Sequence, residues 1–193
     1  MNYQKLEKNV IDLLFKELDP RYVYHNVNHT LDVLESANRI AEYEQLNAND
    51  FVLLKTAALL HDVGFIKQYD DNEEISAEIT GNLLPDYDYT EDQIQVVCRM
   101  IRMTASRMKP ECYLDRLLCD ADLDYLGRND YLNKSMLLFR EWREMKNGMT
   151  LREWYEIQVS FLENHSYFST YSKIYRENKK NQFLSEIKEL LNR

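Results

Sequence analysis

Two imidazoles and two carboxylates of this sequence have the chemical character to hold one divalent cation: His29, the adjacent pair His61 and Asp62, and Asp122. The chain has only four histidines, and His25 and His29 fall together in one short polar stretch. Neutral imidazole and carboxylate suit first-row divalent metals. A metal with open positions polarises a phosphoryl oxygen and lowers the pKa of a bound water to about 7. The chemistry that these residues indicate is hydrolysis.

Helices are the elements expected to position them. Four glycines and three prolines among 193 residues leave few breaks in regular structure. Apolar residues at helical spacing predict an amphipathic helix that starts at Asn26 or Asn28: Val27, Leu31, Leu34, Ala37 and Ala41. Thr90 with Gln93 and Thr150 with Glu153 match capping boxes, so helices should begin near 91 and 151.

The fold that follows is all-α. We expect a single domain over residues 1–193, a compact bundle of about eight to ten helices with a C-terminal helical extension from about 150. Ile174, Phe183, Ile187 and Leu190 should form the packing face of that extension.

The ligand candidates lie at informative points of these helices. Residues 51–61 are apolar on nearly every side, so this helix should be buried, with His61 and Asp62 at its end. His25 and His29 share a face if the second helix begins by His25; if it begins at Asn28, His29 lies in its first turn. Asp122 interrupts an apolar stripe, where an unpaired charge is costly. Binding a cation, capping a helix or pairing with an arginine would each resolve this.

Structural roles compete with these functional ones. A lone histidine on an amphipathic helix is more often a hydrogen-bonded core residue than a ligand, and we interpret His165 in that way. Glu73 and Glu74 are equally well explained as catalytic groups or as first-turn residues of a helix capped by Asn72. Tyr24 is expected at the boundary of the core, with a solvated hydroxyl.

Composition narrows the class of partner. A formal net charge of -9 argues against binding a nucleic-acid polymer, although Arg99, Arg102, Arg107 and Lys109 could attract a small anion. No apolar run is long enough to cross a bilayer, so we expect no membrane partner and a cytoplasmic protein. The three cysteines form no Cys-x-x-Cys pair and are expected to be reduced.

The ordered motifs resemble those of a known family. Tyr24-His25-Asn26-x-x-His29-Thr30, His61-Asp62-Val63-Gly64 and Asp120-Ala121-Asp122-Leu123 are similar to the signature of the HD-domain superfamily of metal-dependent phosphohydrolases. The segment 71–77, Thr104 and Leu126-Gly127 resemble a bacterial subgroup of predicted HD phosphohydrolases.

This resemblance implies four metal ligands, His29, His61, Asp62 and Asp122, with Asp122 preferred to Asp120. His25 stands where cyclic-nucleotide phosphodiesterases hold a proton-donating histidine. Relatives with a second metal supply more histidines, and His25 and His165 are the two left here, so a histidine-rich two-metal site is excluded. A weak second cation held by Asp62, water and substrate is not.

We therefore expect a phosphohydrolase with one divalent metal ion (Mn, Fe, Co, Ni, Zn or Mg). Its partner would be a small phosphorylated substrate, with a nucleotide as a candidate. His25 or Glu73 would move the proton and Asp62 would act both as ligand and in catalysis; Lys67, Arg102 or Arg107 would neutralise phosphate charge. The alternatives are a non-enzymatic nucleotide-binding sensor built on the same metal site and a helical interaction protein. A homodimer is one option for the assembly.

Overall fold

Helices account for all the regular structure of the described residues, 1–105, 108–146 and 148–192 of this computed structural model. Ten are α-helices: α1 (Tyr3–Glu17), α2 (Val27–Tyr43), α3 (Ala48–Leu60), α4 (Asn72–Leu83), α5 (Glu91–Met103), α6 (Tyr113–Asp122), α7 (Tyr131–Met145), α8 (Leu151–Asn164), α9 (Thr170–Tyr175) and α10 (Glu177–Leu191). Three short 3-10 helices join them: η1 (Val63–Ile66), η2 (Leu84–Tyr87) and η3 (Asp124–Gly127). The all-α prediction is confirmed.

Local signals explain where several helices begin. Thr90 and Thr150 both form complete capping boxes, so α5 and α8 start at the predicted positions. Asn26 caps α2, because its side chain accepts a hydrogen bond from the backbone N–H of Asn28. Helix α2 therefore begins at Val27, which places His29 in its first turn.

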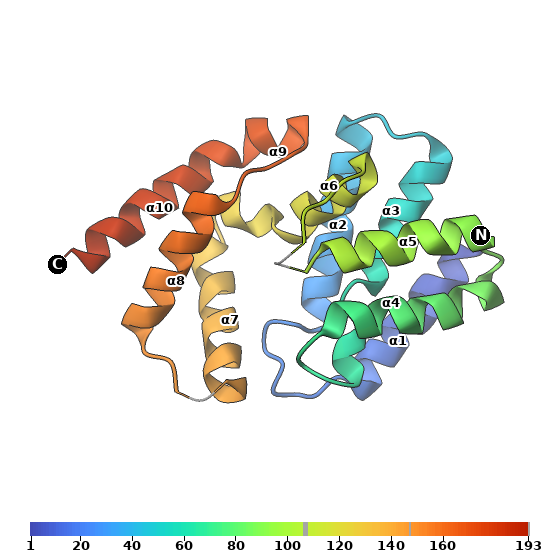
Figure 1. Cartoon of the computed structure of the whole chain (residues 1–193), viewed down its shortest axis with the longest axis horizontal. Coiled ribbons are helices and arrows are strands. Elements are labelled where there is room, and N and C mark those ends of the chain that lie inside the picture. The colour runs from blue at the N-terminus through green and yellow to red at the C-terminus, as the bar shows by residue number, and fades with distance from the viewer. Residues whose placement is uncertain (106–107, 147, 193) are drawn as a thin grey trace.

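Two hydrophobic cores divide the helices into two groups. Helices α1–α6 share the larger core, with α3 at its centre, where Leu54, Ala57 and Leu60 are fully buried. The second core joins η3 to α7, α8 and α10 through Tyr131, Leu162 and Phe183. Figure 1 shows α7, α8 and α10 together on one side of the molecule and α1–α5 on the other. The region between the groups is where the ends of α3 and α6 lie.

Three apolar residues do not lie where the periodicity predicted. Leu31, expected in the buried stripe of α2, is 43% exposed. Phe183 and Ile187 are buried as predicted, whereas Ile174 and Leu190 are more than half exposed. The physical reason is the same in each case: the neighbouring helices cover only part of an apolar stripe, and the residues on its uncovered edge remain in solvent. Over the described part of the chain, no helix is long and apolar enough to span a membrane.

Candidate metal centre

Side chains from three helix ends meet at one point between the two groups of helices. His29 Nε2 lies 3.3 Å from His61 Nε2, 3.3 Å from Asp62 Oδ2 and 3.2 Å from Asp122 Oδ1. His61 Nε2 lies 3.2 Å from the same Asp62 oxygen and 3.6 Å from the same Asp122 oxygen. The four residues that the motifs singled out are therefore brought together, one nitrogen or oxygen from each.

These separations fit the coordination of a small cation. Ligand atoms about 2.1 Å from a metal lie roughly 3.0 Å apart at right angles and roughly 3.4 Å apart at tetrahedral angles. The spacings of 3.2–3.6 Å fall close to this range. His29, His61 and Asp122 also form a compact group by ligand-atom distance alone.

Neighbouring groups orient two of the ligands. His61 Nδ1 lies 2.8 Å from the carbonyl oxygen of Ala58, an acceptor, so Nδ1 carries the hydrogen and Nε2 presents a lone pair when the ring is neutral. Asn72 donates from its amide to Asp62 Oδ1, at 3.2 Å. The other oxygen, Asp62 Oδ2, is buried and receives no hydrogen bond from any described group. A buried carboxylate oxygen without a donor is the observation expected of a metal ligand.

Gly64 allows this arrangement because η1 packs tightly against α4. A Cβ at Gly64 would lie 2.2 Å from the backbone oxygen of Asn72. The backbone N–H of Gly64 donates to Ser76 Oγ at 2.7 Å. The close approach sets Asp62, two residues earlier, beside the Asn72 amide, and a larger residue at position 64 would push the two segments apart.

The four groups together attract positive charge. Burial lowers the pKa of His29 and of His61, but the carboxylates of Asp62 and Asp122 outweigh burial and raise both pKa values. Burial raises the pKa of each carboxylate, but the two imidazoles outweigh it and hold both pKa values below the usual range. A divalent cation satisfies two carboxylates and two imidazole lone pairs at once, so the donor set fits the metal that the motifs imply.

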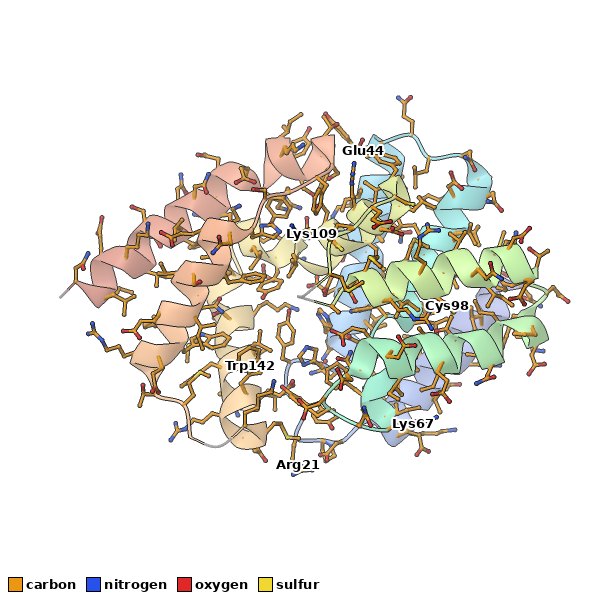
Figure 2. The ribbon with its side chains drawn as sticks, in the orientation of Figure 1. Arg21, Glu44, Lys67, Cys98, Lys109 and Trp142 are labelled. Atoms are coloured by element: carbon orange, nitrogen blue, oxygen red, sulfur yellow. The ribbon has the colours of Figure 1, made fainter. Side chains whose placement is uncertain are left out.

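The centre opens into a cavity of about 330 Å³. One wall carries Tyr24, His25, Asn72 and Glu73 beside the candidate ligands, and α7 and α8 form the wall opposite with Trp142, Trp154, Gln158 and Phe161. Figure 2 shows Trp142 between the two groups of helices. The cavity thus combines a polar, charged floor with an aromatic wall, as small-molecule sites commonly do.

His25 borders this cavity and is held by Glu141, a fully buried residue of α7. Its ring nitrogen Nδ1 contacts Glu141 Oε1, and Glu141 Oε2 accepts from the backbone N–H groups of His25 and Tyr24, at 3.0 and 2.8 Å. Burial raises the pKa of Glu141, but His25 and these amides outweigh it and lower the pKa. The ionised carboxylate accepts the Nδ1 hydrogen, which leaves Nε2 as the ring nitrogen that can exchange a proton. The imidazole also stacks on Phe65, with ring centroids 4.3 Å apart.

Several other residues of interest lie elsewhere. Asp120 points away from the centre and accepts backbone hydrogen bonds from Phe168 and Ser169. Lys67 lies at the edge of the molecule, apart from Trp142 (Figure 2), and outside the cavity wall. Arg102 donates two hydrogen bonds to Glu74, at 2.8 and 2.9 Å. Arg107 lies outside the described residues.

Two interpretations need correction. Asn72 is the first residue of α4 and binds Asp62, whereas Asp71, in a left-handed conformation, is the N-cap. Tyr24 is 6% exposed, so it is not a boundary residue; its ring lies against His29 and His25, with centroids 4.8 Å apart in each case.

Glu141 and Gln158 were missed by the sequence interpretation. Glu141 follows Leu138 by three positions, which places it on an apolar face, but its charged neighbours Arg140, Arg143 and Glu144 make that segment resemble a solvated surface. Gln158 lies within an ordinary amphipathic pattern that gives no signal of a site.

Comparisons with known proteins agree with this geometry. Residues 26–125 match the family model described as HD domain, a range that contains all four candidate ligands. A crystal structure of a predicted HD superfamily hydrolase from an uncultured Thermotogales bacterium has a TM-score of 0.64 and 22% identity, covering 97% of this chain and 91% of that chain; at this identity the likeness is one of fold. An uncharacterized protein of Clostridium beijerinckii (strain ATCC 51743 / NCIMB 8052) is 37% identical over 84 residues, 42% of this chain and 53% of that protein. The chain thus matches about half the length of that relative.

Proposed function

Because this chain belongs to the HD-domain family, we propose that it is a metal-dependent phosphohydrolase that cleaves a phosphate ester of a small molecule, with a nucleotide as the favoured candidate. The observation that carries the proposal is the buried Asp62 Oδ2, which receives no hydrogen bond from the described residues and lies among three other ligand atoms at the floor of a cavity. A cavity of about 330 Å³ has the volume of a small-molecule site and not of a polymer groove.

His29, His61, Asp62 and Asp122 would hold the metal. When bound, a divalent metal supplies a Lewis acid for a phosphoryl oxygen and lowers the pKa of a coordinated water toward neutrality. Two of these ligands are already oriented by hydrogen bonds: the carbonyl oxygen of Ala58 fixes the ring of His61, and the amide of Asn72 fixes the carboxylate of Asp62. Such fixed partners keep a ligand set in place without reorganisation when substrate enters.

His25 is the proposed proton donor to the departing oxygen. It borders the cavity, and its contact with Glu141 keeps the ring in one orientation. Glu73, in the first turn of α4, lines the same cavity and is the alternative proton carrier. Tyr69 donates to Glu141 Oε1 at 3.2 Å, which helps to hold that carboxylate in position.

Turnover of a phosphate-ester panel tests this function. The panel would contain nitrophenyl phosphate, bis-nitrophenyl phosphate, an alkyl phosphate and several 5′-nucleotides, each assayed with and without Mn²⁺. We expect metal-dependent phosphate release by the wild type, none by His61→Ala, and wild-type rates for His165→Gln, a matched control at a histidine outside the centre. Tight nucleotide binding with no release of phosphate from any ester would instead favour the sensor alternative.

A further inference from the structure

The cavity wall opposite the metal centre carries a single amide among aromatic side chains. Trp142 of α7 and Trp154 and Phe161 of α8 line this wall. Gln158, on the same helix, is 4% exposed and lines the cavity with them. A flat apolar enclosure that contains one polar side chain is suited to an aromatic ring with one polar edge.

A chain of buried hydrogen bonds fixes how the Gln158 amide is turned. Trp154 Nε1, which can only donate, donates to Ser135 Oγ at 3.1 Å. Ser135 accepts there and directs its own hydrogen to Gln158 Oε1, at 3.3 Å. The hydroxyl of Tyr131 donates to the same oxygen at 2.9 Å. Burial raises the pKa of Tyr131, so this phenol stays protonated as a donor.

The amide nitrogen is left to face the cavity. Two hydroxyl groups direct their hydrogens to Oε1 on the protein side, so turning the amide over would leave both hydroxyl hydrogens without an acceptor. Among the described residues no acceptor receives the Gln158 amide hydrogens, and the residue is more than nine-tenths buried. The wall thus presents N–H donors and no side-chain acceptor at this point.

We infer that this wall is a nucleobase subsite in which the Gln158 amide N–H binds a keto oxygen of the base, between Trp142 and Phe161. The inference rests on the proposed function, which supplies a phosphate at the opposite wall. The orientation of the Gln158 amide also determines which base is preferred. A keto base such as hypoxanthine offers an acceptor at C6, whereas adenine presents an amino group there, and the locked Gln158 oxygen is unable to accept its hydrogens.

Intrinsic fluorescence tests the subsite without any turnover. The two tryptophans of this chain, Trp142 and Trp154, both line the cavity, so their emission reports on its occupancy. The probes are inosine and adenosine, which differ at C6, with ribose as the control lacking a base. Each is titrated into chelator-treated, metal-free protein. For wild type we expect inosine to bind about tenfold more tightly than adenosine, the worth of roughly one hydrogen bond, and ribose to leave the emission unchanged.

Two variants distinguish the role of the Gln158 amide from the role of the hydroxyl groups that fix its orientation. Gln158→Leu should bind the two nucleosides equally, because the donor is gone. Tyr131→Phe keeps the donor and removes one of its two anchors, so its preference for inosine should shrink without disappearing. If Gln158→Leu fails to fold by circular dichroism, the double variant Tyr131→Phe/Gln158→Leu replaces it, since removing both partners of a buried hydrogen bond is close to neutral.

Equal binding of inosine and adenosine by wild type, or an inosine preference that survives in Gln158→Leu, would overturn the subsite. Failure of the proposed hydrolase function would give a different set of results from failure of the subsite. Selective quenching by inosine in a protein that hydrolyses no phosphate ester would support the subsite and refute the hydrolase, whereas hydrolysis without base selectivity would do the reverse.

Discussion

Asp120 and Asp122 are two residues apart on α6, and alanine at each should have opposite consequences. Asp122 faces His29 and His61, with its Oδ1 3.2 and 3.6 Å from their Nε2 atoms. Asp120 is fully buried on the other side and accepts from the backbone N–H groups of Phe168, at 3.0 Å, and Ser169, at 2.7 Å. Asp122→Ala should therefore abolish metal binding with little effect on the metal-free fold, whereas Asp120→Ala should destabilise the fold and keep the metal.

The size of the second effect follows from the bonds that are lost. Hydrogen bonds to a charged group contribute about 1.5–3 kcal/mol each, and the two donors would be left buried without a partner. Burial raises the pKa of Asp120, however, because removing the carboxylate from water is costly. This cost offsets part of the stabilisation by the hydrogen bonds. A net loss of about 2–4 kcal/mol in the free energy of unfolding is expected, which for a chain of this length lowers Tm by roughly 5–15 °C.

Urea denaturation in the presence of a chelator measures the stability of both variants, and elemental analysis after dialysis against Mn²⁺ measures their metal content. The chelator matters, because bound metal would itself stabilise the wild type. A greater loss of metal in Asp120→Ala than in Asp122→Ala would refute the assignment of the last ligand. A metal-free Asp122→Ala protein destabilised as much as Asp120→Ala would show that Asp122 is structural.

Three further predictions address the proton donor, pH and partner class. His25→Ala should keep its metal and lose activity by about 10²–10⁴-fold on an alkyl phosphate, with a much smaller loss on a nitrophenyl ester that needs no protonation; equal losses on both would instead indicate substrate positioning. Burial and the charge of Lys180 lower the pKa of His165 to about 4, below its unfolded value near 6.5. The unfolded chain then binds the extra proton, so the contribution of His165 to stability should be full above pH 6.5 and fall by about 2–4 kcal/mol as the pH drops to 4. Urea titrations of wild type and His165→Gln over this range measure this loss as the difference between the two proteins, which should shrink above pH 6.5. With a net charge of -9, the protein should show no duplex DNA binding in a gel-shift assay at physiological salt, and steeply salt-dependent binding would contradict this reading of its charge.

The parts of the fold that the sequence predicted are those set by neighbouring residues. The capping boxes at Thr90 and Thr150 involve partners three positions away, and both helices begin where they indicate. The apolar run that becomes α3 has no polar face, which is why its burial was predictable. Leu31 and Ile174 show the limit of this reasoning: periodicity identifies an apolar stripe, but only the neighbouring helices determine which edge of it is covered.

In the candidate site, too, some residues could be predicted from local sequence and others could not. Residue types and motif order indicated His29, His61, Asp62 and Asp122, and in the structure one oxygen of each carboxylate lies 3.2–3.6 Å from the two imidazole nitrogens. Glu141 could not be identified in this way, because its partner His25 lies 116 positions earlier and the contact exists only after α7 packs against the first group of helices. The role of the Gln158 amide likewise could not be predicted, because its orientation depends on contacts with the Tyr131 and Ser135 side chains.

A crystal grown or soaked with Mn²⁺ and measured for anomalous scattering would locate the metal itself. We predict one strong peak about 2.0–2.3 Å from His29 Nε2, His61 Nε2, Asp62 Oδ2 and Asp122 Oδ1. The same experiment on His61→Ala should show no peak at that position. An anomalous peak held by other groups, or none between these four atoms in the wild type, would contradict the metal centre and with it the proposed hydrolysis.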